Sequence, residues 1–186
     1  MPVKNIVDVA ADSMKKAVEH VGSQLAKVRT GRASASILDN VKVEYYGEKT
    51  PVSQVGSVSI PDARSIMIQP WDRSVLGAME KAILAANLGV TPQNDGQVIR
   101  INVPPLTEER RKDLVKQCKK IAEEGKLVVR NIRRDANEEL KVAEKKEHYS
   151  EDERIRGEDD VQKATDKFVK EIDVILVAKE KEVMEE

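Results

Sequence analysis

Residues 107–147 read TEERRKDLVKQCKKIAEEGKLVVRNIRRDANEELKVAEKKE, and this stretch decides the fold. It contains no proline. It opens with Thr107 and two glutamates, which is typical of a helix N-terminus, where a hydroxyl caps free N–H groups and acids complement the dipole. A helix of about 40 residues is about 60 Å long. Because its apolar side must be covered, the stretch predicts the longest member of a helical bundle.

Apolar and basic residues follow one another on nearly opposite faces of this helix. Each set recurs at steps of three or four, and the two-residue offset between them is roughly 200° of rotation. The expected apolar seam contains Leu114, Cys118, Ile121, Gly125, Val128 and Ile132. The expected basic stripe contains Lys112, Lys116, Lys119, Lys126, Arg130 and Arg133, interrupted by Glu123. We expect the stripe to face outward toward a polyanion.

The alternative is that this row of cations only keeps the helix in solution. Arg130, Arg133 and Arg134 form a cluster, however, and arginine forms forked hydrogen bonds with phosphate. Aromatic residues are almost absent from the helix, so we expect contact with the backbone of folded RNA or DNA and no base stacking. Arg29 and Arg32 either stabilise a helix C-terminus or make a second phosphate contact.

Two further helices are expected to complete the bundle. The first ends near Gly31 and carries a heptad seam of Val7, Ala11, Met14, Val18, Val21, Leu25 and Val28. Ser150 and Glu153 match a capping box before the last helix. Its seam contains Val161, Thr165, Phe168, Ile172 and Ile175. Three seams predict a three-helix bundle from residues 1–30 and 106–186.

Residues 31–105 have a different character. Alternating or β-branched patterns predict strands at 41–45, 57–60, 65–68 and 97–103. Residues 46–51 are expected to form a turn, and Asp72 to precede a helix reaching Gly89. The region is therefore an inserted β/α/β domain in an α+β fold.

The insertion requires two chain crossings, at 29–33 and 103–106. The crossings contain Arg29, Thr30, Gly31 and Arg32 on one side and Val103, Pro104 and Pro105 on the other. Two adjacent connections would permit bending and limit twisting, so we interpret them as a hinge, with a fixed joint as the alternative.

Composition and charge distribution limit the classes of function that the chain can have. The chain has 186 residues, 35% charged and 3% aromatic, with a net charge of −1. Residues 107–149 have 13 Lys or Arg against 10 Asp or Glu, whereas 150–186 have 7 against 13, a polarity that suggests an oriented encounter with a partner. No apolar run is long enough for a signal peptide or a membrane span, so we expect a cytoplasmic protein.

The sequence gives no positive case for an enzyme, a cofactor or a metal. Cys118 lies on the apolar seam, where a small hydrophobic side chain belongs, and neither His20 nor His148 is placed as an obvious base for it. One cysteine and two distant histidines make a poor metal site, and phosphate-loop and metalloprotease motifs are absent.

Five segments resemble the ribosome recycling factor family and extend over essentially the whole chain. They are Lys27–Ala33 (KVRTGRA), Val43–Gly47 (VEYYG), Pro104–Leu114 (PPLTEERRKDL), Val129–Ala136 (VRNIRRDA) and Asp159–Lys163 (DDVQK). The resemblance implies an L-shaped protein with the outline of a transfer RNA, whose long arm is the bundle and whose short arm lies on a flexible hinge.

The resemblance also implies a function. Members bind the large ribosomal subunit after termination and, with elongation factor G and GTP, split the ribosome so that messenger and deacylated transfer RNA leave. Arg130, Arg133 and Arg134 match the family's ribosomal RNA contacts. Arg29, Gly31 and Arg32 match its hinge motif, and Pro104 and Pro105 match its second crossing.

We expect a monomer. The rival hypotheses are a coiled-coil adaptor that binds proteins and a small enzyme in the inserted domain.

Overall fold

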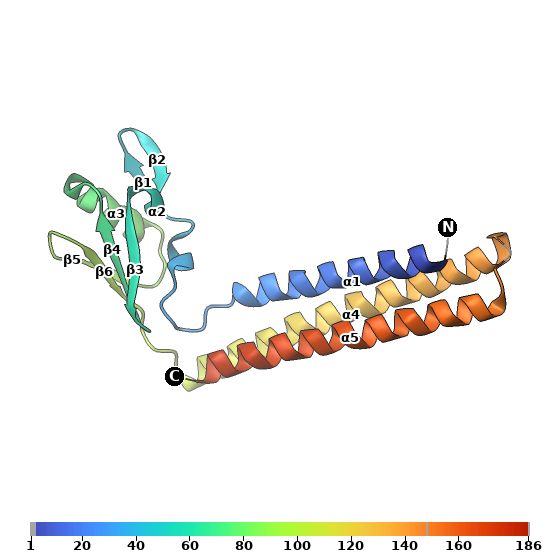
Figure 1. The fold of residues 1–186 in the computed structure, drawn as a ribbon. Helices are drawn as coiled ribbons and strands as arrows, with labels where there is room; N and C mark the ends of the chain where they lie inside the picture. The colour runs from blue at the N-terminus through green and yellow to red at the C-terminus, as the bar shows by residue number, and fades with distance from the viewer. Residues whose placement is uncertain (1–2, 148, 186) are drawn as a thin grey trace. The chain divides into compact units, whose positions relative to one another are not determined.

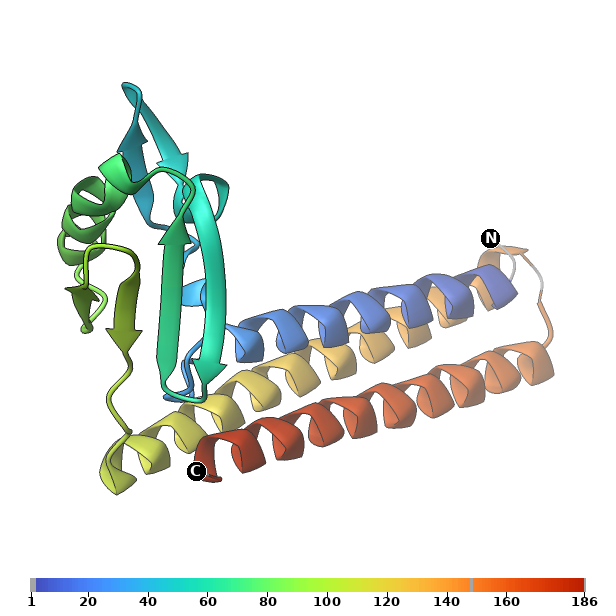
Figure 2. The ribbon, with the colours of Figure 1, turned by 60° about the vertical axis from the view of Figure 1, so that its left-hand side comes forward.

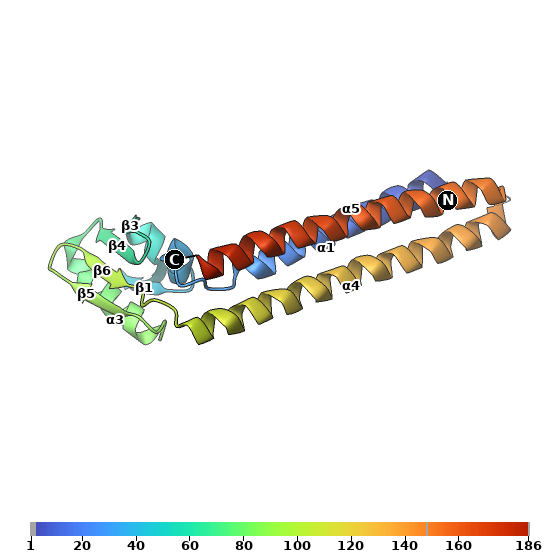
Figure 3. The same cartoon turned by 90° about the horizontal axis from the view of Figure 1, so that it is seen from below.

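The computed structural model describes residues 3–147 and 149–185. The chain forms two compact units, one of Met1–Thr30 with Glu108–Glu186 and one of Gly31–Thr107. The first unit is a bundle of α1 (Val3–Ala26), α4 (Glu108–Glu147) and α5 (Glu151–Met184). Each helix packs along the other two, and α1 begins at the end of the bundle where the chain turns from α4 into α5 (Figures 1 and 3). The expected α+β fold class, long helices with a small sheet domain, is confirmed.

The helix starts follow their local sequence. Ser150 and Glu153 form the expected capping box: the Ser150 N–H donates to Glu153 Oε2 at 2.9 Å, and the Glu153 N–H donates to Ser150 Oγ at 3.3 Å. Both contacts use N–H groups that a helix terminus leaves without partners. Helix α4 carries Glu108 and Glu109 in its first turn. Helix α1 ends at Ala26, before the expected stop near Gly31.

The buried faces of the helices repeat every eleven residues, a longer repeat than the expected seven. On α4, Leu114, Gly125 and Ala136 are buried, as are Cys118, Val129 and Leu140. On α5, Val161, Ile172 and Val183 follow the same interval. Eleven residues in three turns is 3.67 per turn, slightly more than the 3.6 of a straight helix. Such a repeat favours a slight right-handed supercoil, in place of the left-handed one that a seven-residue repeat imposes.

This longer repeat corrects part of the predicted seams. On α1, Ile6 and Ala10 are buried, whereas the expected Val7 and Ala11 are only half-buried. The C-terminal part of that seam is confirmed from Met14 to Val28. On α5, the seam is confirmed except at Ile175, which is half-buried.

The second unit contains a four-stranded antiparallel sheet and a separate hairpin (Figure 2). The sheet has the order β3-β4-β6-β5, formed by Gly56–Asp62, Ser65–Pro70, Ile99–Asn102 and Thr91–Asn94 respectively. The hairpin joins β1 (Lys42–Tyr45) to β2 (Glu48–Pro51), and the short α2 (Val52–Val55) follows it. Single 3₁₀ turns occupy Ala35–Leu38 and Arg73–Val75, and α3 spans Leu76–Ala85.

A separate apolar core holds this unit together. Ile66 and Ile68 on β4 pair with Ile101 and Ile99 on β6, and all four are fully buried. The same core includes Met79 of α3, which is also fully buried. Alternation along each strand sends these side chains to one face, where α3 covers them.

The structure differs from the expected elements in three places. Residues 48–51, expected to be part of a turn, form β2. Strand β5 was not expected, because its Thr-Pro-Gln-Asn sequence has no apolar alternation; it forms by pairing with β6. Asp72 accepts a hydrogen bond from the Ser74 N–H as expected, but this caps a 3₁₀ turn, and α3 ends at Ala85 instead of reaching Gly89.

Candidate nucleic-acid interface

The rotation of α4 decides which of its cations face outward. Ala122 and Val129 are buried, whereas Ile121 is half-buried and Val128 is 47% exposed, so the prediction that the last two lie on the inner seam is wrong. Each step of one residue along a helix rotates the side-chain direction by 100°. The buried face is therefore turned toward the predicted basic stripe, and that stripe is divided into two rows.

One row borders α5 and is paired with its acids. Lys126 binds Asp173 across the two helices and Glu123 on its own helix at 3.0 Å, and its side chain is only 12% exposed. The hydrogen bond that the Lys126 ammonium donates to the Asp173 carboxylate raises the pKa of Lys126. Lys119 lies 3.7 Å from Glu180 of α5. Lys126 is therefore used within the bundle, whereas the Lys119 side chain stays 61% exposed beside its partner.

The second row is exposed. Lys116, Arg130 and Arg134 are on the surface, and no hydrogen bond or ion pair joins their side chains to any other residue that the structure describes. Lys112 lies on the same side but is paired with Glu108 at 2.7 Å. A guanidinium has five N–H donors, so Arg130 and Arg134 present ten uncommitted donors within five residues of helix. Such a surface is suited to phosphate oxygens.

Arg133 lies between the two rows. It is half-buried, and its Nη1 donates to Oε1 of Gln162 on α5 at 3.0 Å. Arg133 was expected on the outward stripe, without a partner on α5. A signal was present: Asp166, Asp173 and Glu180 recur every seven residues, as do Lys119, Lys126 and Arg133, and antiparallel helices bring such rows together.

The expected hinge residues lie at the two places where the chain passes between the units. The Thr30 side chain is buried and donates to Glu182 Oε1 of α5 at 3.2 Å, which attaches it to the bundle. Gly31 has a φ of +82°, and a Cβ there would lie 2.7 Å from Leu106 Cγ. Pro104 and Pro105 are exposed, and the preceding Val103 N–H donates to the Arg64 carbonyl at 2.7 Å. The first connection is thus attached to the bundle at Thr30, and the second to the small unit at Val103.

The candidate catalytic residues are not arranged for catalysis. Cys118 is fully buried in the bundle, and burial raises the pKa of its thiol, which disfavours the reactive thiolate. His20 is exposed on α1, and His148 lies outside the described residues. Over residues 3–147 and 149–185, no group of His, Cys, Asp and Glu side chains could hold a metal.

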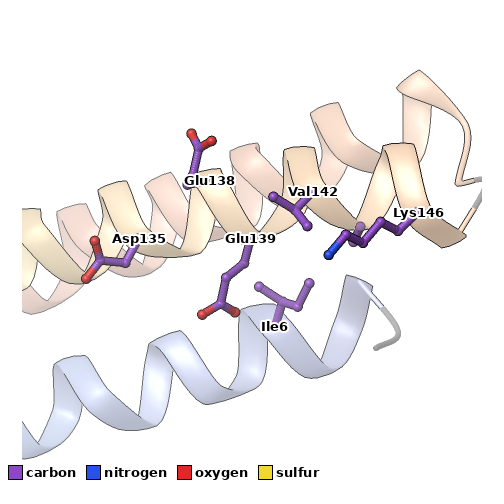
Figure 4. Close-up of a pocket in the computed structure, with 7 residues that line it drawn as sticks. Ile6, Asp135, Glu138, Glu139, Val142 and Lys146 are labelled. Atoms are coloured by element: carbon purple, nitrogen blue, oxygen red, sulfur yellow. The ribbon is translucent and has the colours of Figure 1, made fainter.

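A groove of about 430 Å³ lies between α1 and α4 (Figure 4). In this view Glu139 and Val142 extend toward Ile6 of α1, whereas Glu138 points away. The groove is lined by aliphatic groups, three carboxylates and Lys146, without a cysteine, a serine or a histidine.

The structure therefore has a long three-helix bundle, on which the side chains of Arg130 and Arg134 have no partner among the described residues, and a small second unit joined to it by two connections. These features define a two-unit α+β protein with a basic surface on its bundle. No helix among the described residues has the length and apolar character needed to cross a bilayer.

Comparison with known proteins identifies the family. The family model for ribosome recycling factor matches residues 21–184. The ribosome-recycling factor of Nitratidesulfovibrio vulgaris (strain DP4) is 54% identical over 185 residues, covering all of both chains. That of Geobacillus sp. (strain WCH70) is 55% identical over 184 residues, covering 98% of this chain and 99% of the relative. The chain belongs to the ribosome recycling factor family.

Solved structures agree with this assignment. A solution structure of ribosome recycling factor is 46% identical, with a TM-score of 0.74 over 98% of this chain and 97% of that one. A second structure gives models for the T. thermophilus ribosome recycling factor and the E. coli elongation factor G bound to the E. coli post-termination complex. The match to it is 44% identical, with a TM-score of 0.63 over 99% of this chain and all of that one.

Proposed function

We propose that this protein, acting as a monomer in the cytoplasm, binds the large ribosomal subunit after termination and splits the ribosome together with elongation factor G and GTP. Messenger RNA and deacylated transfer RNA would leave as the subunits separate. Family membership supports the role in recycling, and the T. thermophilus relative is described on a post-termination complex with elongation factor G. The protein itself hydrolyses nothing in this proposal, and GTP is consumed by its partner.

The proposal that the protein docks on 23S ribosomal RNA rests on Arg130 and Arg134, whose side chains have no partner among the described residues. Arg130 and Arg134 would contact phosphates directly, with Lys116 farther along the same row and Arg133 at its border with α5. Phosphate contacts release condensed counterions, so affinity should fall steeply with salt. Lys119 and Lys126, predicted from sequence to belong to the same interface, have a smaller part in this proposal because each lies beside an α5 carboxylate.

A salt titration tests this docking surface. Arg130→Ala should weaken binding to large subunits about tenfold and reduce the slope of log affinity against log salt by about 0.7–0.9, the value for one phosphate contact. Lys112→Ala is the matched control, because it removes a cation from the same helix that already has a partner in Glu108. Equal affinity and equal slopes for the two variants would remove Arg130 from the interface.

The joint between the units is proposed as the hinge through which elongation factor G moves the bundle. Two connections of different stiffness would let a force on the small domain bend the joint without free rotation. Replacing Pro104 and Pro105 by glycines should leave affinity for the large subunit unchanged and slow the splitting, measured by light scattering with elongation factor G and GTP. Unimpaired splitting by this variant would contradict the hinge, while a wild-type protein that binds but never splits ribosomes would contradict the recycling role.

A further inference from the structure

A relay of side chains on α5 holds Arg133. The Arg133 Nη1 donates to Gln162 Oε1 at 3.0 Å, and the Gln162 Nε2 donates to Asp166 Oδ1 at 2.8 Å. Gln162 and Asp166 are four residues apart on α5, so both face the same side of that helix. The relay therefore links a guanidinium on α4 to a carboxylate on α5 through a neutral amide.

The order of groups in the relay follows from their chemistry. A carboxylate only accepts hydrogen bonds, so Asp166 takes the NH₂ group of Gln162. The amide oxygen is then left facing α4, where the guanidinium, which only donates, can use it. Asp166 thereby fixes which end of the Gln162 amide Arg133 meets.

The neutral amide distinguishes Arg133 from the other cations on the border with α5. Lys119 and Lys126 occur fourteen and seven residues earlier, and their cross-helix partners are the carboxylates Glu180 and Asp173. Within the described chain, no carboxylate is paired with Arg133. A carboxylate partner compensates the charge of a cation, whereas an amide accepts a hydrogen bond and leaves that charge available.

We propose that Gln162 is a positioning residue for RNA binding, which holds Arg133 against α5 while leaving its positive charge and remaining donors free for a ribosomal RNA phosphate. This inference rests on the proposed docking function. Holding a long side chain in place removes part of the entropy cost of ordering it on binding. Arg133 would then act with the exposed Arg130 and Arg134 as one phosphate-binding group whose border is fixed by α5.

Replacement of Gln162 by glutamate or methionine separates charge from positioning. Gln162→Glu places a carboxylate against Arg133 and should weaken binding to large subunits about tenfold, with a salt slope lower by about 0.7–0.9. Gln162→Met removes the acceptor at similar size and should weaken binding only a few-fold with the slope unchanged, because the charge of Arg133 remains. In Gln162→Glu the new ion pair with Arg133 is opposed by repulsion from Asp166, four residues away on α5. The thermal unfolding temperature of each variant is therefore measured first, and affinities are compared well below it, where a loss of affinity cannot be attributed to unfolding.

A double-mutant cycle provides the decisive control. In an Arg133→Ala background, Gln162→Glu should cause no further loss of affinity, because its target is gone. A full additional tenfold loss there, or wild-type affinity and slope for Gln162→Glu alone, would overturn the role of Gln162. If Arg130→Ala and Arg133→Ala both retain wild-type affinity and slope, the docking proposal itself fails.

Discussion

Gly125 in the middle of α4 provides the sharpest test of how the bundle is packed. A Cβ built on this residue would overlap Cγ2 of Val21 on α1 and would lie 3.6 Å from Cδ1 of Ile172 on α5. Glycine inside a helix costs about 1 kcal/mol relative to alanine. Its presence here is explained by the close approach of α1.

We expect Gly125→Ala to destabilise the bundle despite its better helix propensity. Val21 is β-branched and nearly fixed in χ1 within a helix, so it cannot rotate away from the new methyl group. Overpacking of this kind costs about 3 kcal/mol at the upper end of its usual range, and the gain in propensity returns about 1 kcal/mol. The net loss of unfolding free energy should be about 2 kcal/mol.

The sign of the effect should reverse when Val21 is shortened. Val21→Ala alone should cost about 2 kcal/mol through lost burial and a cavity. In that background, Gly125→Ala places its methyl in the vacated space and should stabilise by about 1 kcal/mol, so the two mutations would be coupled by about 3 kcal/mol. Urea unfolding followed by far-ultraviolet circular dichroism measures all four variants, since the long helices dominate that signal.

One outcome would refute this reasoning. If Gly125→Ala stabilises the protein by a similar amount with either residue at position 21, α1 does not approach α4 as closely as the structure has it. Fluorescence of Trp71, the single tryptophan, which lies in the other unit, provides an internal control. Its folded-state spectrum should be the same in all four variants.

Four further substitutions test other parts of the structure. Gly31→Ala should destabilise by about 1–3 kcal/mol, because φ is +82° and the new Cβ meets a neighbouring side chain, whereas Gly22→Ala, with open space around it, should stabilise by about 1 kcal/mol in the same urea assay. Two backbone N–H groups hold the pKa of Asp95 below its ordinary value of 3.8. The contribution of the Asp95 carboxylate to the stability of the fold is therefore complete at neutral pH and is lost as pH falls through the folded pKa. Asp95→Asn should therefore flatten the fall in the urea midpoint below about pH 4, and an unchanged profile would contradict this. Lys126→Met should lower stability, because it leaves an acid of α5 without its cation, and should leave the salt slope of ribosome binding unchanged; a reduced slope would return this lysine to the interface.

Local sequence was sufficient to predict most element starts and the fold class. The capping box of Ser150 and Glu153 forms between residues three positions apart, so it can be predicted without any tertiary contact. The strand at 65–68 was predictable for a similar reason, because its isoleucines occupy alternate positions. By contrast, β5 has no such pattern, and only its pairing with β6 makes it a strand.

The sequence by itself determined that α4 is one long amphipathic helix with a basic side, because propensity, capping and spacing act within a few residues of chain. Only the tertiary structure decided the angle at which that helix meets α1 and α5. A one-residue difference in the buried set, Val129 instead of Val128, turns the inner face by 100° at that position. That rotation brings Lys126 to a carboxylate and Arg133 to an amide, and leaves Arg130 uncommitted, because the fate of a surface charge depends on what a neighbouring helix places beside it.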